Sequence, residues 1–251
     1  YHRENGLILL AEPGRLAAVM ADDLATDASV VPLTDFAGLL GPEAGYGSGT
    51  KVMIEATSLP KSLYDILDGS AVELVRRACP VMHAKVVKNE VEQEGTRRAH
   101  IEDGASVVRF LSWLETVSPG QMQETEIAAH LLSIRRENSN FISSSFETIC
   151  GSGPNGAIVH YRAIKGADSP LMDNSLLLVD SGAHYTNGTT DITRTMAIGT
   201  PSDEMCHAFT CVLKGHIAVA RARFPADSTG QQIDVLARGP LWAEGMDYAH
   251  G

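Results

Sequence analysis

The stretch that most constrains the fold is residues 176–199, LLLVDSGAHYTNGTTDITRTMAIG. An apolar run ends on Asp180, and a segment rich in β-branched residues returns through Asp191, as suits a pleated, half-buried surface. Between them lies Asn187-Gly188, the strongest short-range signal for a β-hairpin. The stretch therefore predicts a hairpin with a two-residue loop at Asn187-Gly188 and one aspartate on each arm.

These two aspartates are candidate metal ligands. The predicted loop places His184 opposite Asp191, and Asp180 shares a face with His184 because strand side chains alternate. Both carboxylates then point the same way but lie about four residues apart, roughly 13 Å in an ideal strand. A shared metal ion would need a bend, which Gly182 would permit. Two carboxylates alone are a weak metal signal, so a pair of solvent-facing strand aspartates stays an alternative.

The hairpin and three other segments resemble one enzyme family. DSGAHYTNGTTDITRT resembles the metal-binding hairpin of the pita-bread metallopeptidases, in which the spacing of Asp180 and Asp191 recurs. SFETICGSGPNGAIVHY (145–161), VLKGHIAVARARFP (212–225) and GMDYAHG (245–251) resemble aminopeptidase P, the Xaa-Pro aminopeptidase, in its three-domain cytosolic type. The resemblance runs from about Lys85 to the last residue.

The resemblance implies roles for four residues. Asp180 and Asp191 would be ligands of two divalent cations, expected to be Mn²⁺. His160, predicted on the second of two strands that flank GSGPNG, and His250 would be catalytic residues that bind a peptide with proline at its second position. The family's remaining ligands, a histidine four residues after the position of His250 and two later glutamates, would lie beyond residue 251. The gene product is thus expected to be a Xaa-Pro aminopeptidase, and these 251 residues alone to bind metal weakly without turnover.

Two alternatives stay open. One is another pita-bread peptidase, either prolidase or methionyl aminopeptidase, and KGHIAVA and DYAHG favour aminopeptidase P over both. The other is a pita-bread module that binds a partner without catalysis. The presence of Asp180, Asp191 and His160 argues against such a module.

The expected architecture is α+β, with a small α/β domain before a partial pita-bread catalytic domain. The boundary is placed between residues 82 and 83, and residues 1–82 would be a non-catalytic, creatinase-like domain with strands at 7–11 and 51–55 and helices at 15–24 and 62–67. A helix over 88–116 would bury one apolar stripe. Its members are Ile101, Ala105, Val108, Leu111 and Leu114. Residues 83–251 match the first half and the start of the second half of the catalytic domain, so the chain is expected to be truncated at both ends.

Composition limits the classes of molecule that the protein is expected to bind and the cellular compartment in which it is expected to lie. Lys and Arg number 20 against 31 Asp and Glu, a net charge of −11, which argues against a nucleic-acid or anionic-membrane binder. No apolar run approaches the ~20 residues of a membrane span. The four cysteines have no CxxC spacing, which favours reduced thiols in a cytoplasmic protein. Homodimer formation is left open.

Overall fold

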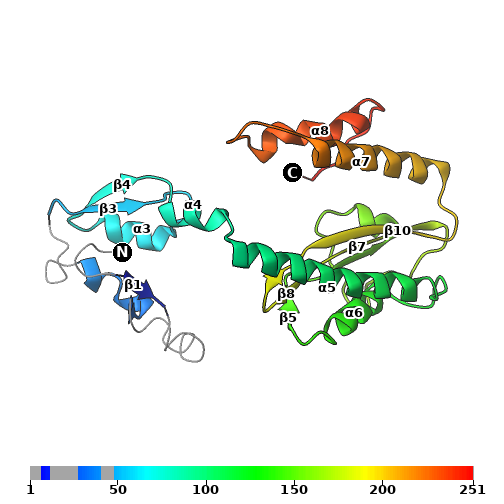
Figure 1. The fold of residues 1–251 in the computed structure, drawn as a ribbon, viewed down its shortest axis with the longest axis horizontal. Coiled ribbons are helices and arrows are strands. Elements are labelled where there is room, and N and C mark those ends of the chain that lie inside the picture. Colours follow the sequence, from blue (N-terminus) through cyan, green and yellow to red (C-terminus); the bar gives the residue numbers. More distant parts are fainter. Residues whose placement is uncertain (1–6, 12–27, 41–47, 251) are drawn as a thin grey trace. The chain divides into compact units, whose positions relative to one another are not determined.

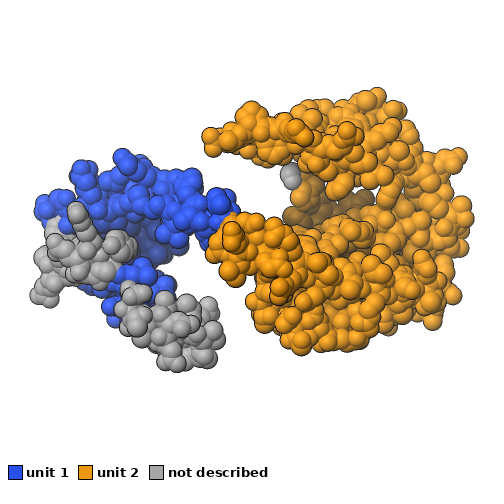
Figure 2. Space-filling model, in the orientation of Figure 1, with its two compact units in different colours: residues 1–87 blue, residues 88–251 orange. Residues whose placement is uncertain are grey.

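The computed structural model describes residues 7–11, 28–40 and 48–250 and separates the chain into two compact units (Figure 2). Unit 1 spans residues 1–87 and unit 2 spans residues 88–251. The division lies a little after the predicted boundary at residues 82 and 83. The helix predicted over residues 15–24 lies outside the described residues.

Unit 1 contains two parallel strand pairs, with a helix in the crossover of the second pair. Its described elements are β1 (Leu7–Leu10), β2 (Ala28–Val31), η1 (Leu33–Asp35), η2 (Gly38–Leu40), β3 (Lys51–Ile54), α3 (Lys61–Asp68), β4 (Glu73–Arg76) and α4 (Pro80–Val86). The strands predicted at 7–11 and 51–55 and the helix predicted at 62–67 are confirmed. A parallel pair needs a crossover, and α3 supplies it between β3 and β4.

Unit 2 combines helices with two three-stranded antiparallel sheets (Figure 1). Its elements are α5 (Glu90–Leu114), α6 (Glu124–Arg135), β5 (Phe141–Ser144), β6 (Ile149–Ser152), η4 (Gly153–Ala157), β7 (Ser175–Ser181), β8 (Ala183–Tyr185), β9 (Gly188–Thr189), β10 (Ile192–Ile198), α7 (Asp203–Arg221) and α8 (Gly230–Trp242). The sheets have the strand orders β10-β7-β6 and β5-β8-β9. None of the helices in the described ranges has both the length and the hydropathy needed to cross a membrane.

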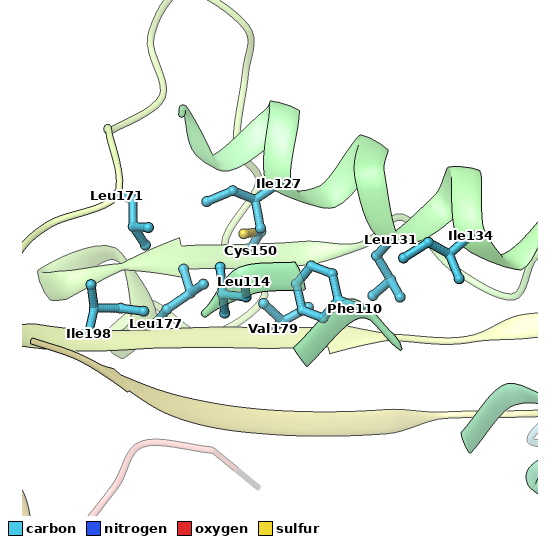
Figure 3. Packing of buried hydrophobic residues seen from close by; sticks show 10 residues of the cluster. All are labelled: Phe110, Leu114, Ile127, Leu131, Ile134, Cys150, Leu171, Leu177, Val179 and Ile198. Atoms are coloured by element: carbon cyan, nitrogen blue, oxygen red, sulfur yellow. The ribbon is translucent and has the colours of Figure 1, made fainter. Parts of the chain in front are cut away.

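The main core of unit 2 lies between α5, α6 and one face of the β10-β7-β6 sheet (Figure 3). Strand β7 alternates, so that Leu177 and Val179 are buried in this core while Leu178 and Asp180 are only partly buried. Because successive strand side chains point to opposite faces, Asp180 lies on the face turned away from the core. The packed helices thus support the sheet from behind, and Asp180 shares the other face with Leu178.

The buried face of α5 differs from the predicted apolar stripe. Ile101 is 73% exposed, Val108 is 64% exposed and Ala105 is also exposed, so that prediction is wrong for these three. The residues that are buried include the polar side chains of Asp103 and Ser106; the full set is Ala99, Asp103, Ser106, Val107, Phe110 and Leu114. The physical reason is that Arg135 of α6 pairs with Asp103 inside the unit, which lets a charged residue occupy the inner face of the helix.

Candidate active site

The predicted hairpin forms, but its loop lies one residue earlier than expected. Tyr185 pairs with Gly188, so the two-residue loop is Thr186-Asn187 and the prediction of an Asn187-Gly188 loop is wrong. Gly188 is used for close packing instead of for a positive φ. A Cβ at Gly188 would lie 3.0 Å from the Cβ of Ala99 on α5. The glycine therefore lets the hairpin approach the helix.

This register brings the two aspartates closer together than predicted. Thr193 pairs with Asp180, and continuation of the same register places Asp191 across from Gly182. Asp191 is therefore displaced from Asp180 by two residues along the ribbon instead of the predicted four. Both carboxylates lie on one face, as predicted. The Cα atoms of diagonal neighbours of this kind are roughly 7–8 Å apart, which long side chains can span.

The two carboxylates interact directly. Burial, the neighbouring charge of Asp180 and a hydrogen bond with its carboxylate together raise the pKa of Asp191. Asp180 also accepts a hydrogen bond at Oδ1 from the Thr193 hydroxyl, at 2.7 Å. Two carboxylates this close repel each other when both are ionised, and a divalent cation, which prefers hard oxygen donors, would offset that repulsion. The donor chemistry thus fits a divalent cation.

The two aspartates supply only part of a metal-binding set. Within residues 7–11, 28–40 and 48–250, no group of three or more His, Cys, Asp or Glu side chains could hold a metal ion. A hard divalent cation usually takes six or more oxygen or nitrogen ligands, several of them waters, at roughly 2.0–2.6 Å. Asp180 and Asp191 can therefore contribute to such a site but do not complete it.

The two candidate histidines come together in space. The rings of His160 and His250 lie edge to face with their centroids 5.3 Å apart, although 90 positions separate them in the sequence. The prediction that a strand carries His160 is wrong. After β6 the chain enters the short 3₁₀ helix η4, and a turn closed by the hydrogen bond from Tyr161 N to Ile158 O, at 3.1 Å, then carries His160. Its φ of +54° is in the left-handed region, which is uncommon for a residue other than glycine.

Glu124, the first residue of α6, anchors the segment on both sides of His160. Its side chain is fully buried and accepts four hydrogen bonds. The donors are Ser152 N at 2.7 Å, Asn155 Nδ2 at 2.9 Å, the Tyr161 hydroxyl at 2.8 Å and Ser169 N at 3.0 Å. All four donors are uncharged, and the positive end of the helix dipole favours the carboxylate. This anchor supports the left-handed backbone of His160.

Arg238 of α8 anchors the segment that carries His250. Its Nη1 donates to Asp247 Oδ1 at 2.9 Å and to the carbonyl of Tyr248 at 2.7 Å, and its Nη2 donates to the carbonyl of His250. The guanidinium also lies over the Tyr248 ring, 4.1 Å from the ring centroid. These contacts hold the backbone of residues 247–250 against the end of α8.

An apolar cavity of about 930 Å³ adjoins the aspartates. It lies between the outer face of the sheet and α7, and its walls include Leu178, Phe209 and Val212. Thr193, the hydrogen-bond partner of Asp180, also lines it. The four candidate site residues are not among its lining residues, so the cavity borders the polar site without containing it.

Sequence reasoning missed the charged residues that hold these segments in place. Glu124 and Arg238 lie on helices, where charged residues are usually solvated, and each has partners outside its own helix. One signal was available for Asp103, the buried acid of α5. It stands in line with Ala99, Val107 and Phe110 at spacings of three and four, where a charge is unexpected unless it is paired.

Comparisons with known proteins give a consistent result. Residues 94–251 match the model of "Metallopeptidase family M24". The chain is 43% identical over 213 residues to a "Probable Xaa-Pro aminopeptidase P" of Phaeosphaeria nodorum, covering 83% of this chain and 32% of the relative. It is 45% identical over 175 residues to the protein of the same description in Neurospora crassa, covering 68% of this chain and 26% of the relative. The chain thus spans about a third or less of the length of these curated relatives.

Solved structures resemble the fold over almost the whole chain. One is an X-prolyl aminopeptidase from Caenorhabditis elegans, described as a cytosolic enzyme with a di-nuclear active site, with a TM-score of 0.81 and 29% identity over 97% of this chain and 41% of that one. Another is a Xaa-Pro dipeptidase from Bacillus anthracis, with a TM-score of 0.71 and 25% identity over 95% of this chain and 64% of that one. These similarities confirm the predicted α+β class with a partial pita-bread domain.

Proposed function

The chain belongs to metallopeptidase family M24, and from this premise we propose that the full-length protein is a metal-dependent aminopeptidase that releases an N-terminal residue preceding proline. Support comes from the relatives described as Xaa-Pro aminopeptidase P, at 43% and 45% identity. Residues 83–251 would form the first part of the catalytic domain, and residues 1–82 a non-catalytic domain. The substrates would be peptides with proline at the second position, and the location would be the cytosol, as described for the C. elegans neighbour.

The observation that carries this proposal is that Asp180 and Asp191 lie on one face of the hairpin, close enough for the charge of Asp180 to raise the pKa of Asp191. We assign both carboxylates to two divalent cations, with Mn²⁺ as the expected metal, because carboxylate oxygens suit such ions. The di-nuclear site described for the C. elegans neighbour supports the number of ions. When bound, divalent cations supply a water nucleophile at neutral pH and polarise the scissile carbonyl.

His160 and His250 are assigned to the substrate. Their rings face each other at 5.3 Å, and each belongs to a segment that a buried or stacked charged residue holds in place. An imidazole N–H at this position can donate to a peptide carbonyl and stabilise the negative charge that develops on its oxygen during attack. Rigid support matters because such donors act best when they are fixed before the reaction begins.

The test compares two peptides that differ only at the second residue. Full-length protein loaded with Mn²⁺ should release the N-terminal residue from a peptide with proline there and not from its alanine counterpart, as measured by mass spectrometry. Asp191→Asn should abolish this release, whereas Asp203→Asn, at an exposed position in the first turn of α7, should leave it unchanged. Equal cleavage of both peptides, or full activity in Asp191→Asn, would refute the proposal.

Two further assays narrow the reaction. A Xaa-Pro dipeptide offered beside a longer peptide distinguishes an aminopeptidase from a dipeptidase such as the B. anthracis neighbour. The 251 residues expressed alone should bind Mn²⁺ weakly and show no turnover, because the described part of the chain supplies only two of the required ligands. Robust turnover by these residues alone would mean that a different set of groups carries the reaction.

A further inference from the structure

We propose that Asp103, paired with Arg135, is a positioning residue that fixes the metal-binding carboxylate of Asp191 through Thr190. The inference rests on the proposed function, since it takes Asp191 to be a metal ligand. It adds a group from helix α5 to a site whose other members come from strands, turns and the end of the chain. Asp103 itself would touch neither metal nor substrate.

The first observation is that both oxygens of the Asp103 carboxylate are fully hydrogen-bonded. It is fully buried and accepts four hydrogen bonds, two at each oxygen. Arg135 donates from Nε at 2.6 Å and from Nη2 at 3.0 Å, and the hydroxyls of Tyr185 and Thr190 each donate at 2.7 Å. Two helices and the hairpin therefore meet at one carboxylate, and no lone pair of this carboxylate is left unused.

The second observation is that every polar group of Thr190 is occupied. Besides donating to Asp103, its hydroxyl accepts from Ala183 N at 3.0 Å, and its own N donates to Ala183 O at 2.9 Å. Its carbonyl accepts from the Ser145 hydroxyl at 3.0 Å. Thr190 is 1% exposed and immediately precedes Asp191. The backbone that enters Asp191 is thus held from α5, from β8 and from the end of β5.

The third observation is the absence of space between the hairpin and its support. A Cβ at Gly95 of α5 would lie 2.3 Å from the carbonyl oxygen of Asn187 in the hairpin loop. Within the hairpin itself, a Cβ at Gly182 would lie 2.0 Å from the carbonyl oxygen of Thr190 on the opposite arm. A two-stranded hairpin alone is only marginally stable in water, so its exact position is set by what it packs against. Here that support is α5, with the Asp103 carboxylate at its centre.

These contacts matter because Asp191 must be held near a like charge. The two carboxylates repel each other before a cation binds, so without support the strand would relax away from Asp180. The bonds from Asp103 through Thr190 oppose that relaxation and keep the ligand in place. Loss of a group that orients a metal ligand lowers metal affinity by roughly 10- to 100-fold.

The test uses two matched substitutions at the same carboxylate. Thr190→Val and Tyr185→Phe each remove one hydroxyl that donates to Asp103 at 2.7 Å, but only Thr190 adjoins Asp191. In full-length protein, Mn²⁺ titration by calorimetry should show affinity reduced roughly 10- to 100-fold in Thr190→Val. Tyr185→Phe should bind as wild type does, and Thr190→Ser, which keeps the hydroxyl, should restore the affinity. The free energy of unfolding of each variant is measured by urea denaturation.

Each outcome decides between positioning and simple stabilisation. If Thr190→Val and Tyr185→Phe lose similar stability and both keep wild-type Mn²⁺ affinity, Asp103 only stabilises the fold and the inference is wrong. If Thr190→Val does not fold, Arg135→Lys, which keeps the charge but loses one donor, should still weaken Mn²⁺ binding, and unchanged affinity would overturn the inference. A wild-type protein that binds no Mn²⁺, or an Asp191→Asn variant that binds normally, would overturn the proposed function and this inference together.

Discussion

Asp103 and Glu124 are both fully buried carboxylates that accept four hydrogen bonds, yet their charges are balanced in different ways. Asp103, beneath the hairpin, receives two of its bonds from the guanidinium of Arg135. Glu124, at the start of α6 and beneath the turn of His160, receives all of its bonds from uncharged donors. One half of the candidate site therefore rests on a buried ion pair and the other on a buried anion.

The difference is visible in the pKa values around each acid. Burial alone would raise the pKa of Asp103, but the hydrogen bonds from Arg135, Thr190 and Tyr185 and the charge of Arg135 hold it below its ordinary value. Both acids raise the pKa of the tyrosine that donates to them, Tyr185 at Asp103 and Tyr161 at Glu124. Burial, followed by the hydrogen bond to Glu124 and its charge, raises the pKa of Tyr161 to about 12. At Tyr185 the charge of Arg135 opposes the rise in pKa, whereas no cation is among the causes of the shift at Tyr161.

The largest effect should come from removing the cation of the first pair. Arg135→Met leaves the carboxylate of Asp103 buried without compensation, which typically costs about 3–5 kcal/mol. Replacing both partners, as Asp103→Leu with Arg135→Met, should recover only part of that loss, because the charges are gone but the hydroxyls of Tyr185 and Thr190 lose their acceptor. Urea denaturation of the single and double variants measures both values. A single variant as stable as wild type would show that the pair does not balance a buried charge.

A smaller effect should follow at the second anion. Glu124→Gln keeps the shape of the side chain, but its amide NH₂ then faces the N–H of Ser169, which cannot accept a hydrogen bond. One unsatisfied buried donor costs about 1–3 kcal/mol, less than a buried uncompensated charge. Hydrogen exchange should show the loss of protection concentrated in residues 152–169 and not in the hairpin. Equal loosening of both segments would mean that the two anchors act as one unit.

The sequence could predict the elements of this site better than their relative positions. Local chemistry identified the hairpin and its two aspartates, because turn residues and β-branched residues act over a few positions. It placed the loop one residue late, since the role of Gly188 depends on contact with Ala99, which lies far earlier in the chain. His160 was wrongly assigned to a strand for a related reason: the turn that carries it depends on Glu124, from a different element.

Buried charges were the other feature beyond local reasoning. Glu124 looks like a solvated helix residue until Ser169 is known to face it, and the position of Asp103 in the apolar line of α5 does not reveal that Arg135 and Thr190 are its partners. The predicted apolar stripe of α5 included Ile101 and Val108 because of their spacing and apolar character, but both side chains are exposed. Family resemblance supplied the fold class correctly, because several separate motifs agreed in order and spacing. The roles of Asp180, Asp191, His160 and His250 stay predictions for the experiments above.

The smallest effect should appear in the titration of Tyr161. It is a shift of the Tyr161 pKa that leaves the stability near neutral pH unchanged. Because its pKa is raised to about 12 in the folded protein, its contribution to stability is complete below the ordinary value of about 10 and is lost as pH rises through about 12. The difference in ultraviolet absorbance between wild type and Tyr161→Phe, recorded after rapid pH jumps, should give this midpoint. In Glu124→Gln the midpoint should fall but stay above the ordinary value, since burial is the larger cause and persists. An unchanged midpoint in that variant would mean that the charge of Glu124 is balanced after all, and the contrast with Asp103 would disappear.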